Sequence, residues 1–129
     1  MVNTKALEET RSNIRAAQES FQLDHTVEIV AVTKTHPFSA IQEAYNKGVV
    51  SIGENRVQEA VLKFRSFEKM PKMTKRFIGH LQTNKVKKCV ELFDTIDSVD
   101  SLRLIKKISN HALKSNKTVP VLLEVNTSG

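Results

Sequence analysis

The sequence has one cysteine, no tryptophan, and aromatic residues at only 5% of its 129 positions. The single cysteine, Cys89, cannot form a disulfide within the chain, which suits a reducing cytoplasm, and it cannot build a thiolate zinc cluster. Few aromatic rings leave few surfaces on which nucleic-acid bases could stack. No apolar run approaches the roughly 20 residues of a membrane-spanning helix, and residues 1–5 lack the apolar segment of a signal peptide. We therefore expect a cytoplasmic protein that binds no membrane.

Motifs for common catalytic and metal sites are missing as well. The four histidines, His25, His36, His80 and His111, lack the spacing of a zinc-binding HExxH pair. No Walker phosphate loop, glycine-rich dinucleotide motif or GxSxG nucleophile elbow follows an apolar run. These absences argue against a metal site and against nucleotide-binding or hydrolytic chemistry.

The composition predicts a folded domain with a basic surface. Hydrophobic residues make up 40% of the chain, and 20 basic against 14 acidic side chains give a net charge of +6. An excess of positive charge favours acidic partners, either nucleic acid or a small ligand that carries phosphate. The basic residues are spread along the chain, however, and their densest run, Lys85 to Lys88, is short. A basic nucleic-acid-binding module is therefore the least favoured of the functions considered.

Apolar residues alternate between helical and extended spacing along the chain. Residues 3–21 have the pattern of an amphipathic helix. Further helices are expected after Pro37, after Asn55, and after two capping positions, the first at Thr83 or Asn84 and the second at Asp100. Strands are expected over residues 27–33, 49–52, 76–78, 95–99 and 119–125, the first of them buried on both faces. This order predicts a parallel sheet with right-handed crossovers, which fits both a doubly wound sheet and a (βα)8 barrel.

The length of the chain limits the barrel interpretation. A full (βα)8 barrel typically needs about 250 residues, whereas this chain has 129. As a barrel it would be a truncated, N-terminal part, with a leading helix and five parallel strands in one partial domain over residues 1–129. The fifth strand would then have an unpaired edge. We expect this edge to cause self-association or low solubility.

Lys34 directly follows the apolar segment that ends at Thr33. Burial at a strand end disfavours the charged form of a lysine and lowers its pKa. A lysine in this state supplies the neutral amine that forms a Schiff base with a carbonyl-bearing ligand. The alternative is a lysine whose charged head simply extends into water.

Polar residues also follow the other expected strands, at the end of the sheet where ligands of parallel α/β proteins bind. They occupy residues 33–36, 53–56, 79–85 and 126–128. Gly53 and Gly79 permit sharp turns or a close approach of the main chain to a ligand, although glycine and asparagine can also serve only to make the turns. The carboxylates Glu54 and Asp97 could act as acid or base, but carboxylates at strand ends more often cap helices or pair with lysine.

Three segments, in this order, resemble the pyridoxal-phosphate homeostasis protein family. They are residues 31–35 (AVTKT), 53–59 (GENRVQE) and 77–85 (FIGHLQTNK), the last of which resembles the family signature. Residues 97–100 and 125–126 are also similar to family segments, so that the resemblance covers nearly the whole chain.

The resemblance implies a barrel like the N-terminal domain of alanine racemase, with pyridoxal 5′-phosphate (PLP) as the cofactor. Lys34 matches the Schiff-base lysine of the family, and Asn55 matches a residue beside the cofactor. Gln82 and Asn84 match signature positions near the mouth of the barrel. The implied function is PLP binding in intracellular vitamin B6 and amino-acid homeostasis, without catalytic residues or established turnover.

The sequence departs from the family pattern at two positions and in length. His36 stands where a second lysine is common, and Arg76 stands where the signature opens with histidine. Family chains continue well beyond this length, and their second half supplies the phosphate cradle and the arginine that faces the pyridine nitrogen. A racemase-like enzyme of the same fold is the alternative, but racemisation needs an acid or base on each face of the cofactor. The only tyrosine, Tyr45, falls within an expected helix.

Overall fold

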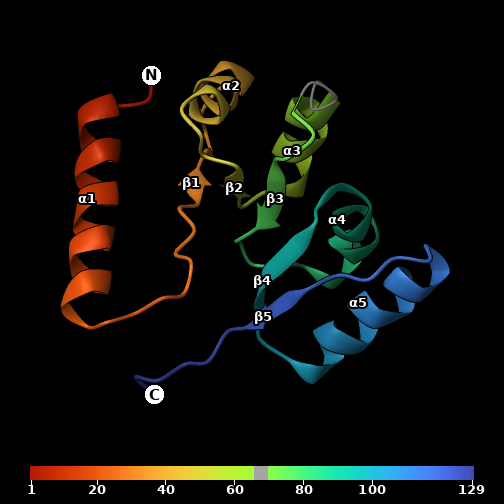
Figure 1. Cartoon of the computed structure of the whole chain (residues 1–129). Helices are drawn as coiled ribbons and strands as arrows, with labels where there is room; N and C mark the ends of the chain where they lie inside the picture. Colours follow the sequence, from red (N-terminus) through yellow and green to blue (C-terminus); the bar gives the residue numbers. More distant parts are fainter. Residues whose placement is uncertain (66–69) are drawn as a thin grey trace.

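Helices and strands alternate along the chain as the sequence predicts (Figure 1). The computed structural model describes residues 1–65 and 70–129. Its elements, in order, are α1 (Thr4–Ser20), β1 (Ala31–Val32), α2 (Phe38–Asn46), β2 (Ser51–Glu54), α3 (Val57–Lys63), β3 (Thr74–Phe77), the 3-10 helix η2 (Thr83–Lys85), α4 (Val86–Leu92), β4 (Thr95–Val99), α5 (Leu102–Lys114) and β5 (Val121–Leu123).

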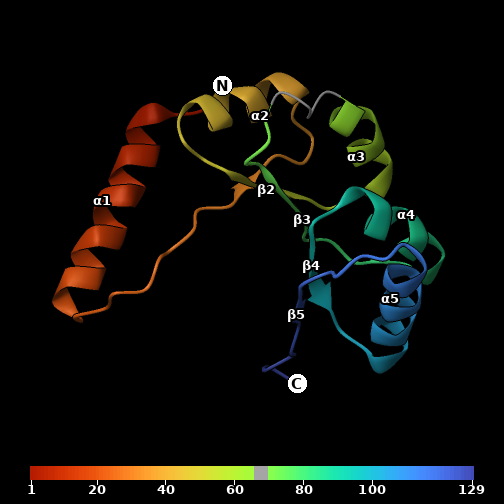
Figure 2. The same ribbon diagram turned by 45° about the vertical axis from the view of Figure 1, so that its right-hand side comes forward.

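The five strands form one parallel sheet in the order β1-β2-β3-β4-β5. Each connection between consecutive strands therefore leads to the adjacent strand, always in the same direction across the sheet. A doubly wound sheet reverses direction at a switch point, and the observed order has no reversal. Figure 2 shows α2, α3, α4 and α5 following one another along one side of the sheet. The arrangement is that of the first part of a (βα)8 barrel, as the resemblance implied.

The hydrophobic core lies between the sheet and these helices. Each central strand contributes a fully buried side chain to it, Ile52 from β2, Phe77 from β3 and Ile96 from β4. The ring of Phe93 packs edge-on against Phe77, with 5.2 Å between the ring centroids. On the opposite face, which is the inner face of a barrel, Val32 of β1 is half exposed. The inner face is thus open at β1, whereas all four residues of β2 are buried.

The first strand differs most from its prediction. The run 27–33 predicts a strand buried on both faces, but only Ala31 and Val32 are in β1, and Val27 is exposed. A parallel strand needs a partner for its main chain, and β2, the only partner of β1 among the described residues, begins at Ser51. For a similar reason β5, which pairs with β4 alone, is shorter than the predicted range 119–125. The range 95–99 is confirmed, and β2 and β3 are each displaced by about two residues from their predicted positions.

Both predicted side-chain caps are wrong. Thr83 and Asn84 lie inside η2, and α4 begins after Lys85 without a side-chain cap. At the start of α5 the cap is Ser101 rather than Asp100, and its hydroxyl accepts a hydrogen bond from the Leu104 amide (3.2 Å). Either residue type can cap a helix, so which of them does so depends on the path of the main chain.

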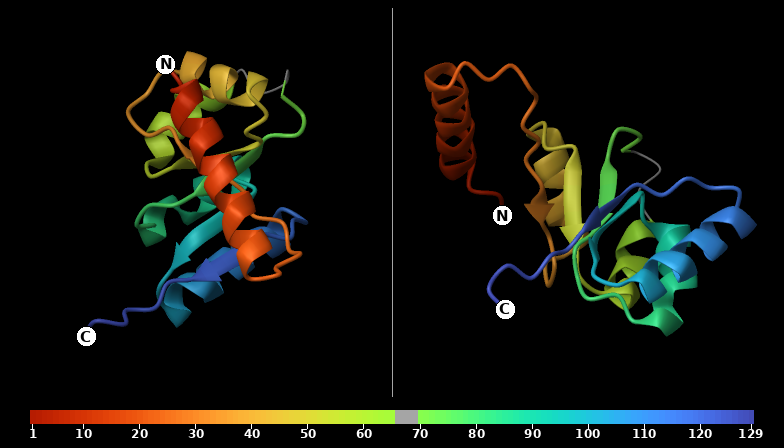
Figure 3. Two further views of the ribbon diagram at one scale, coloured as in Figure 1. Left: turned by 60° about the vertical axis from the view of Figure 1, so that its left-hand side comes forward. Right: turned by 90° about the horizontal axis from the view of Figure 1, so that it is seen from below.

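The helix α1 stands apart from the sheet, as the right-hand view of Figure 3 shows. None of its residues is buried. Its amino end is held by α2, because the Val2 amide donates to Glu43 Oε2 (2.9 Å). This hydrogen bond holds the pKa of the Glu43 carboxyl below its usual value. In the described part of the chain, no helix is long and apolar enough to cross a membrane.

Cys89 gives a direct test of the core. It lies on α4 with no exposed surface, and burial raises the pKa of its thiol to about 12, an effect that Lys117 partly opposes. Because the thiolate is the nucleophile, we expect the folded protein to react with a thiol reagent at pH 8 about 1,000 times more slowly than an unperturbed cysteine. Unfolding in guanidinium should restore rapid reaction. Rapid stoichiometric labelling of the folded protein would contradict this packing.

Candidate functional site

Side chains point alternately to the two faces of the sheet along each strand, and this alternation decides which residues face the helices. Ile52 of β2 packs in the core beneath α2, so Glu54, two residues later, lies on the same helix-facing side. Thr33, just after β1, is buried on this side too, and its hydroxyl donates to Glu54 Oε1 (2.6 Å). Gly53, which lies between Ile52 and Glu54, therefore belongs to the inner face.

The register of β1 and β2 aligns the carboxyl ends of the two strands. Val32 is paired with Gly53, and the Thr33 amide donates to the Gly53 carbonyl (3.1 Å). Lys34 lies in the turn that follows β1, and Asn55 is the first residue after β2. The two residues that the sequence assigns most directly to the cofactor thus follow the carboxyl ends of neighbouring strands.

Lys34 is exposed, which corrects the expectation that this lysine is buried at the end of its strand. It lies in a tight turn, in which the Thr35 hydroxyl donates to the Lys34 carbonyl (2.6 Å) and Thr35 has a φ of 63°. The reason for the exposure is that the inner face of the sheet at β1, unlike the helix side, is not covered by the described residues. The amine is consequently open to a ligand from solution.

The end of β3 packs closely against the end of β2. A Cβ atom on Gly79 would lie 2.3 Å from the Asn55 carbonyl oxygen, which no real structure tolerates. The Ile78 amide donates to the Glu54 carbonyl (2.9 Å), and the Ser98 hydroxyl donates to the Gly79 carbonyl (2.5 Å). Gly79 is therefore needed for close approach, and it sets the position of Asn55.

A pocket of about 370 Å³ opens between these two strand ends. Asn55, Gly79 and Gln82 are among the residues that line it. Asn84 lies instead in the adjoining hollow between the ends of β3 and β4, which Gln82 also lines. Gln82 and Asn84 are both exposed. The structure thus brings Asn55 near Gln82, and Gln82 near Asn84, while Lys34 lines neither hollow.

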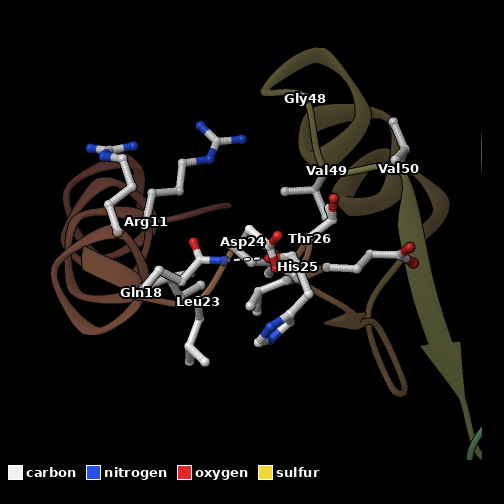
Figure 4. Close-up of a pocket in the computed structure, with 14 residues that line it drawn as sticks. Arg11, Gln18, Leu23, Asp24, His25, Thr26, Gly48, Val49 and Val50 are labelled. Atoms are coloured by element: carbon white, nitrogen blue, oxygen red, sulfur yellow. Dashed lines mark hydrogen bonds between the residues drawn. The ribbon is translucent and has the colours of Figure 1, made fainter. Parts of the chain in front are cut away.

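A larger pocket of about 700 Å³ lies between α1 and the segments that precede β1 and β2 (Figure 4). Two of its polar side chains, Arg11 and Gln18, already have structural partners. Arg11 donates to the Lys47 carbonyl (2.6 Å), and the Gln18 amide group donates to the His25 carbonyl (2.5 Å). The pocket is at the amino ends of the strands, whereas ligands of parallel barrels bind at the carboxyl ends. We therefore place the candidate site at Lys34 and Asn55.

Two charged groups near the site are paired. Arg76 Nε contacts Asp97 Oδ2 at 2.6 Å, on neighbouring strands, so this carboxylate is not a free acid or base. Glu54 pairs with Lys63, Nζ to Oε1 2.8 Å. Sequence reasoning expected a lysine partner for a carboxylate of this kind but did not single out Lys63. The signal was available, because Lys63 follows Ala60 by three residues on the buried side of α3. Among the described residues, no three His, Cys, Asp or Glu side chains are grouped to hold a metal ion.

Residues 6–129 match the family model described as alanine racemase, N-terminal domain. The chain belongs to this family. Among curated relatives, it is 36% identical over 127 residues to the pyridoxal phosphate homeostasis protein of Vibrio alginolyticus, covering 95% of this chain and 54% of the relative. It is 39% identical over 103 residues to the protein of that name from a Synechocystis species, covering 80% and 47%. The chain spans about half the length of the curated relatives it matches.

Solved structures of the family have the same arrangement of strands and helices. PipY of Synechococcus elongatus with PLP bound superposes with a TM-score of 0.77 at 41% identity, over 88% of this chain and 53% of that one. A protein of unknown function from Bifidobacterium adolescentis gives a TM-score of 0.83 at 33% identity, over 100% and 59%. Alanine racemase of Clostridium difficile, 16% identical with a TM-score of 0.63, shares the fold.

Gly79→Ala tests the close approach that positions Asn55. Because the added methyl meets main-chain atoms of Asn55, we expect a destabilisation of about 1–3 kcal/mol and a large shift of the Asn55 amide resonance, measured by denaturant unfolding and NMR. Gly53→Ala is the control, since its methyl meets only the flexible Ile78 side chain. An unchanged Asn55 resonance in Gly79→Ala would contradict this role of Gly79.

Proposed function

We propose that this chain binds PLP as a Schiff base on Lys34 and takes part in intracellular vitamin B6 homeostasis. PLP supplies an aldehyde, with which a lysine amine condenses with loss of one water. The observation that carries the proposal is that an exposed Lys34 and Asn55 follow the carboxyl ends of the paired strands β1 and β2. The structural relative that is 41% identical has PLP bound.

The residues present fit the cofactor. Lys34 is exposed, and Asn55, at the end of the neighbouring strand, offers an amide that can both donate and accept hydrogen bonds. Gln82 and Asn84 add two more exposed amides in the adjoining hollows. We assign these three residues to binding and orienting PLP, and we extend the proposal to amino acids as further small-molecule partners.

We further propose that binding occurs in the cytoplasm and without catalytic turnover. A racemase needs a second acid or base opposite the lysine, and Tyr45 belongs to the last turn of α2 rather than to a strand end. Asp97 is paired with Arg76. The curated relatives are named as homeostasis proteins. Nucleic acid is not part of the proposal, because the basic residues are spread along the chain.

Borohydride trapping tests the assignment of Lys34. Purified protein mixed with PLP and reduced with borohydride should carry the pyridoxyl label chiefly on Lys34, as located by peptide mass spectrometry. Lys34→Ala should lose this label, and Lys106→Ala, which removes an exposed lysine on α5, should keep it. A folded protein whose label is spread evenly over surface lysines would reject the proposal.

The fifth strand supports a second proposal, that copies of this chain associate through it. Among the described residues, β5 pairs with β4 alone, and Leu122 and Leu123 are 54% and 65% exposed. An unpaired apolar strand edge is a template for another strand.

We expect sedimentation velocity to show dimers or larger species that Leu122→Lys shifts towards monomer, because a charge at an edge opposes strand pairing. Leu62→Lys is the matched control, since it changes an exposed leucine on α3 rather than on β5. A compact wild-type monomer would contradict the association.

A further inference from the structure

A buried ion pair lies directly behind the candidate lysine. Glu54, at the end of β2, has no exposed surface, and the Lys63 side chain from α3 is 11% exposed. Their Nζ–Oε1 distance is 2.8 Å. Burying two charges costs free energy that only close pairing and further hydrogen bonds offset. The other contacts of Glu54 and Lys63 therefore decide whether this ion pair has a role beyond stability.

Both members of the pair also bind Thr33, the residue before Lys34. Lys63 Nζ donates to the Thr33 carbonyl (2.9 Å), and the Thr33 hydroxyl donates to Glu54 Oε1 (2.6 Å). Thr33 is thus held through its main chain and its side chain at once. A third bond from its amide to the Gly53 carbonyl completes this anchoring.

The helix α3 also contacts the residue on the other side of Lys34. Glu59 Oε2 accepts a hydrogen bond from the Thr35 amide (3.4 Å). Thr35 has a left-handed main chain, with a φ of 63°, which is unfavourable for a β-branched residue. The turn that carries Lys34 is therefore fixed from α3 at both flanking residues.

A gain in stability alone does not account for the buried ion pair of Glu54 and Lys63. Replacing a buried ion pair by apolar side chains of similar volume is often neutral or stabilising. In the described part of the chain, no donor lies within hydrogen-bond distance of Glu54 Oε2, so the carboxylate is only partly satisfied. What an apolar pair could not provide is the set of bonds to the Thr33 carbonyl and hydroxyl.

We propose that Lys63 and Glu54 are positioning residues for Lys34, a role that rests on the proposed function of Lys34. They fix the main chain at Thr33, and this fixes the start of the turn from which the Lys34 amine extends. A loosely held amine would condense with an aldehyde no faster than any surface lysine, since orientation contributes much of the rate of such reactions.

The test compares two variants with a control. Lys63→Met removes the amine and keeps the length of the side chain. The double variant Glu54→Leu with Lys63→Met removes both buried charges, so its fold is expected to be preserved even if the single variant unfolds. Lys117→Met is the matched control, because Lys117 Nζ also donates to two main-chain carbonyls, those of Val90 and Phe93, and these belong to the α4 region.

Two measurements are made on each protein. The first is the ratio of borohydride-trapped pyridoxyl label on Lys34 to that on Lys106. The second needs no PLP and is the hydrogen-exchange rate of the Thr33 and Thr35 amides. In Lys63→Met and in the double variant, we expect the label ratio to fall about tenfold or more and exchange at Thr33 to accelerate. Lys117→Met should leave both unchanged.

A folded double variant with wild-type labelling and exchange would overturn the positioning role. A wild-type protein that shows no preference for Lys34 would instead reject the proposed function. The exchange rates alone would then decide whether the ion pair fixes this turn.

Discussion

The register of the parallel strands determines where the segments that carry the candidate residues begin. Pairing of Val32 with Gly53 and of Glu54 with Phe77 aligns the carboxyl ends of β1, β2 and β3 in one row. Because side chains alternate between faces, a slip of one residue in β1 would move Val32 from the inner face into the helix layer and shift the turn that carries Lys34. The close contact of Gly79 with Asn55 sets the spacing of the row from its other side. The site is thus a consequence of strand alignment.

Features with a local cause could be predicted from the sequence. The strand at 95–99 and the polar residues at the strand ends both depend on neighbouring residues in the chain. The length of β1 could not be predicted, because it depends on where β2 begins. The cap of α5 required knowing the path of the main chain, which places Ser101 rather than Asp100 at the first free amides.

The environment of Lys34 likewise has one part that could be predicted from the sequence and one part that could not. Its place at a strand end follows from the apolar run before it, but burial depends on what covers the inner face, and no pattern within residues 29–36 contains that information. The relatives are about twice as long as this chain. Exposure of Lys34 and of Val32 therefore has one cause, the uncovered inner face, and does not weaken the assignment of the amine to ligand binding.

The ion pair behind Lys34 explains how an exposed residue can still have a defined position. Exposed side chains are usually free to change rotamer, and their main chain at a strand end is often mobile. At Lys34, motion is limited to the side chain, because the residues on both sides of it are held. Thr33 is bound by Lys63 and Glu54, and Thr35 is bound by Glu59. The buried ion pair of Glu54 and Lys63 on the helix side thus holds the turn at Lys34, where packing on the inner face is absent. The amine is accessible to an aldehyde, and the turn that carries it remains fixed.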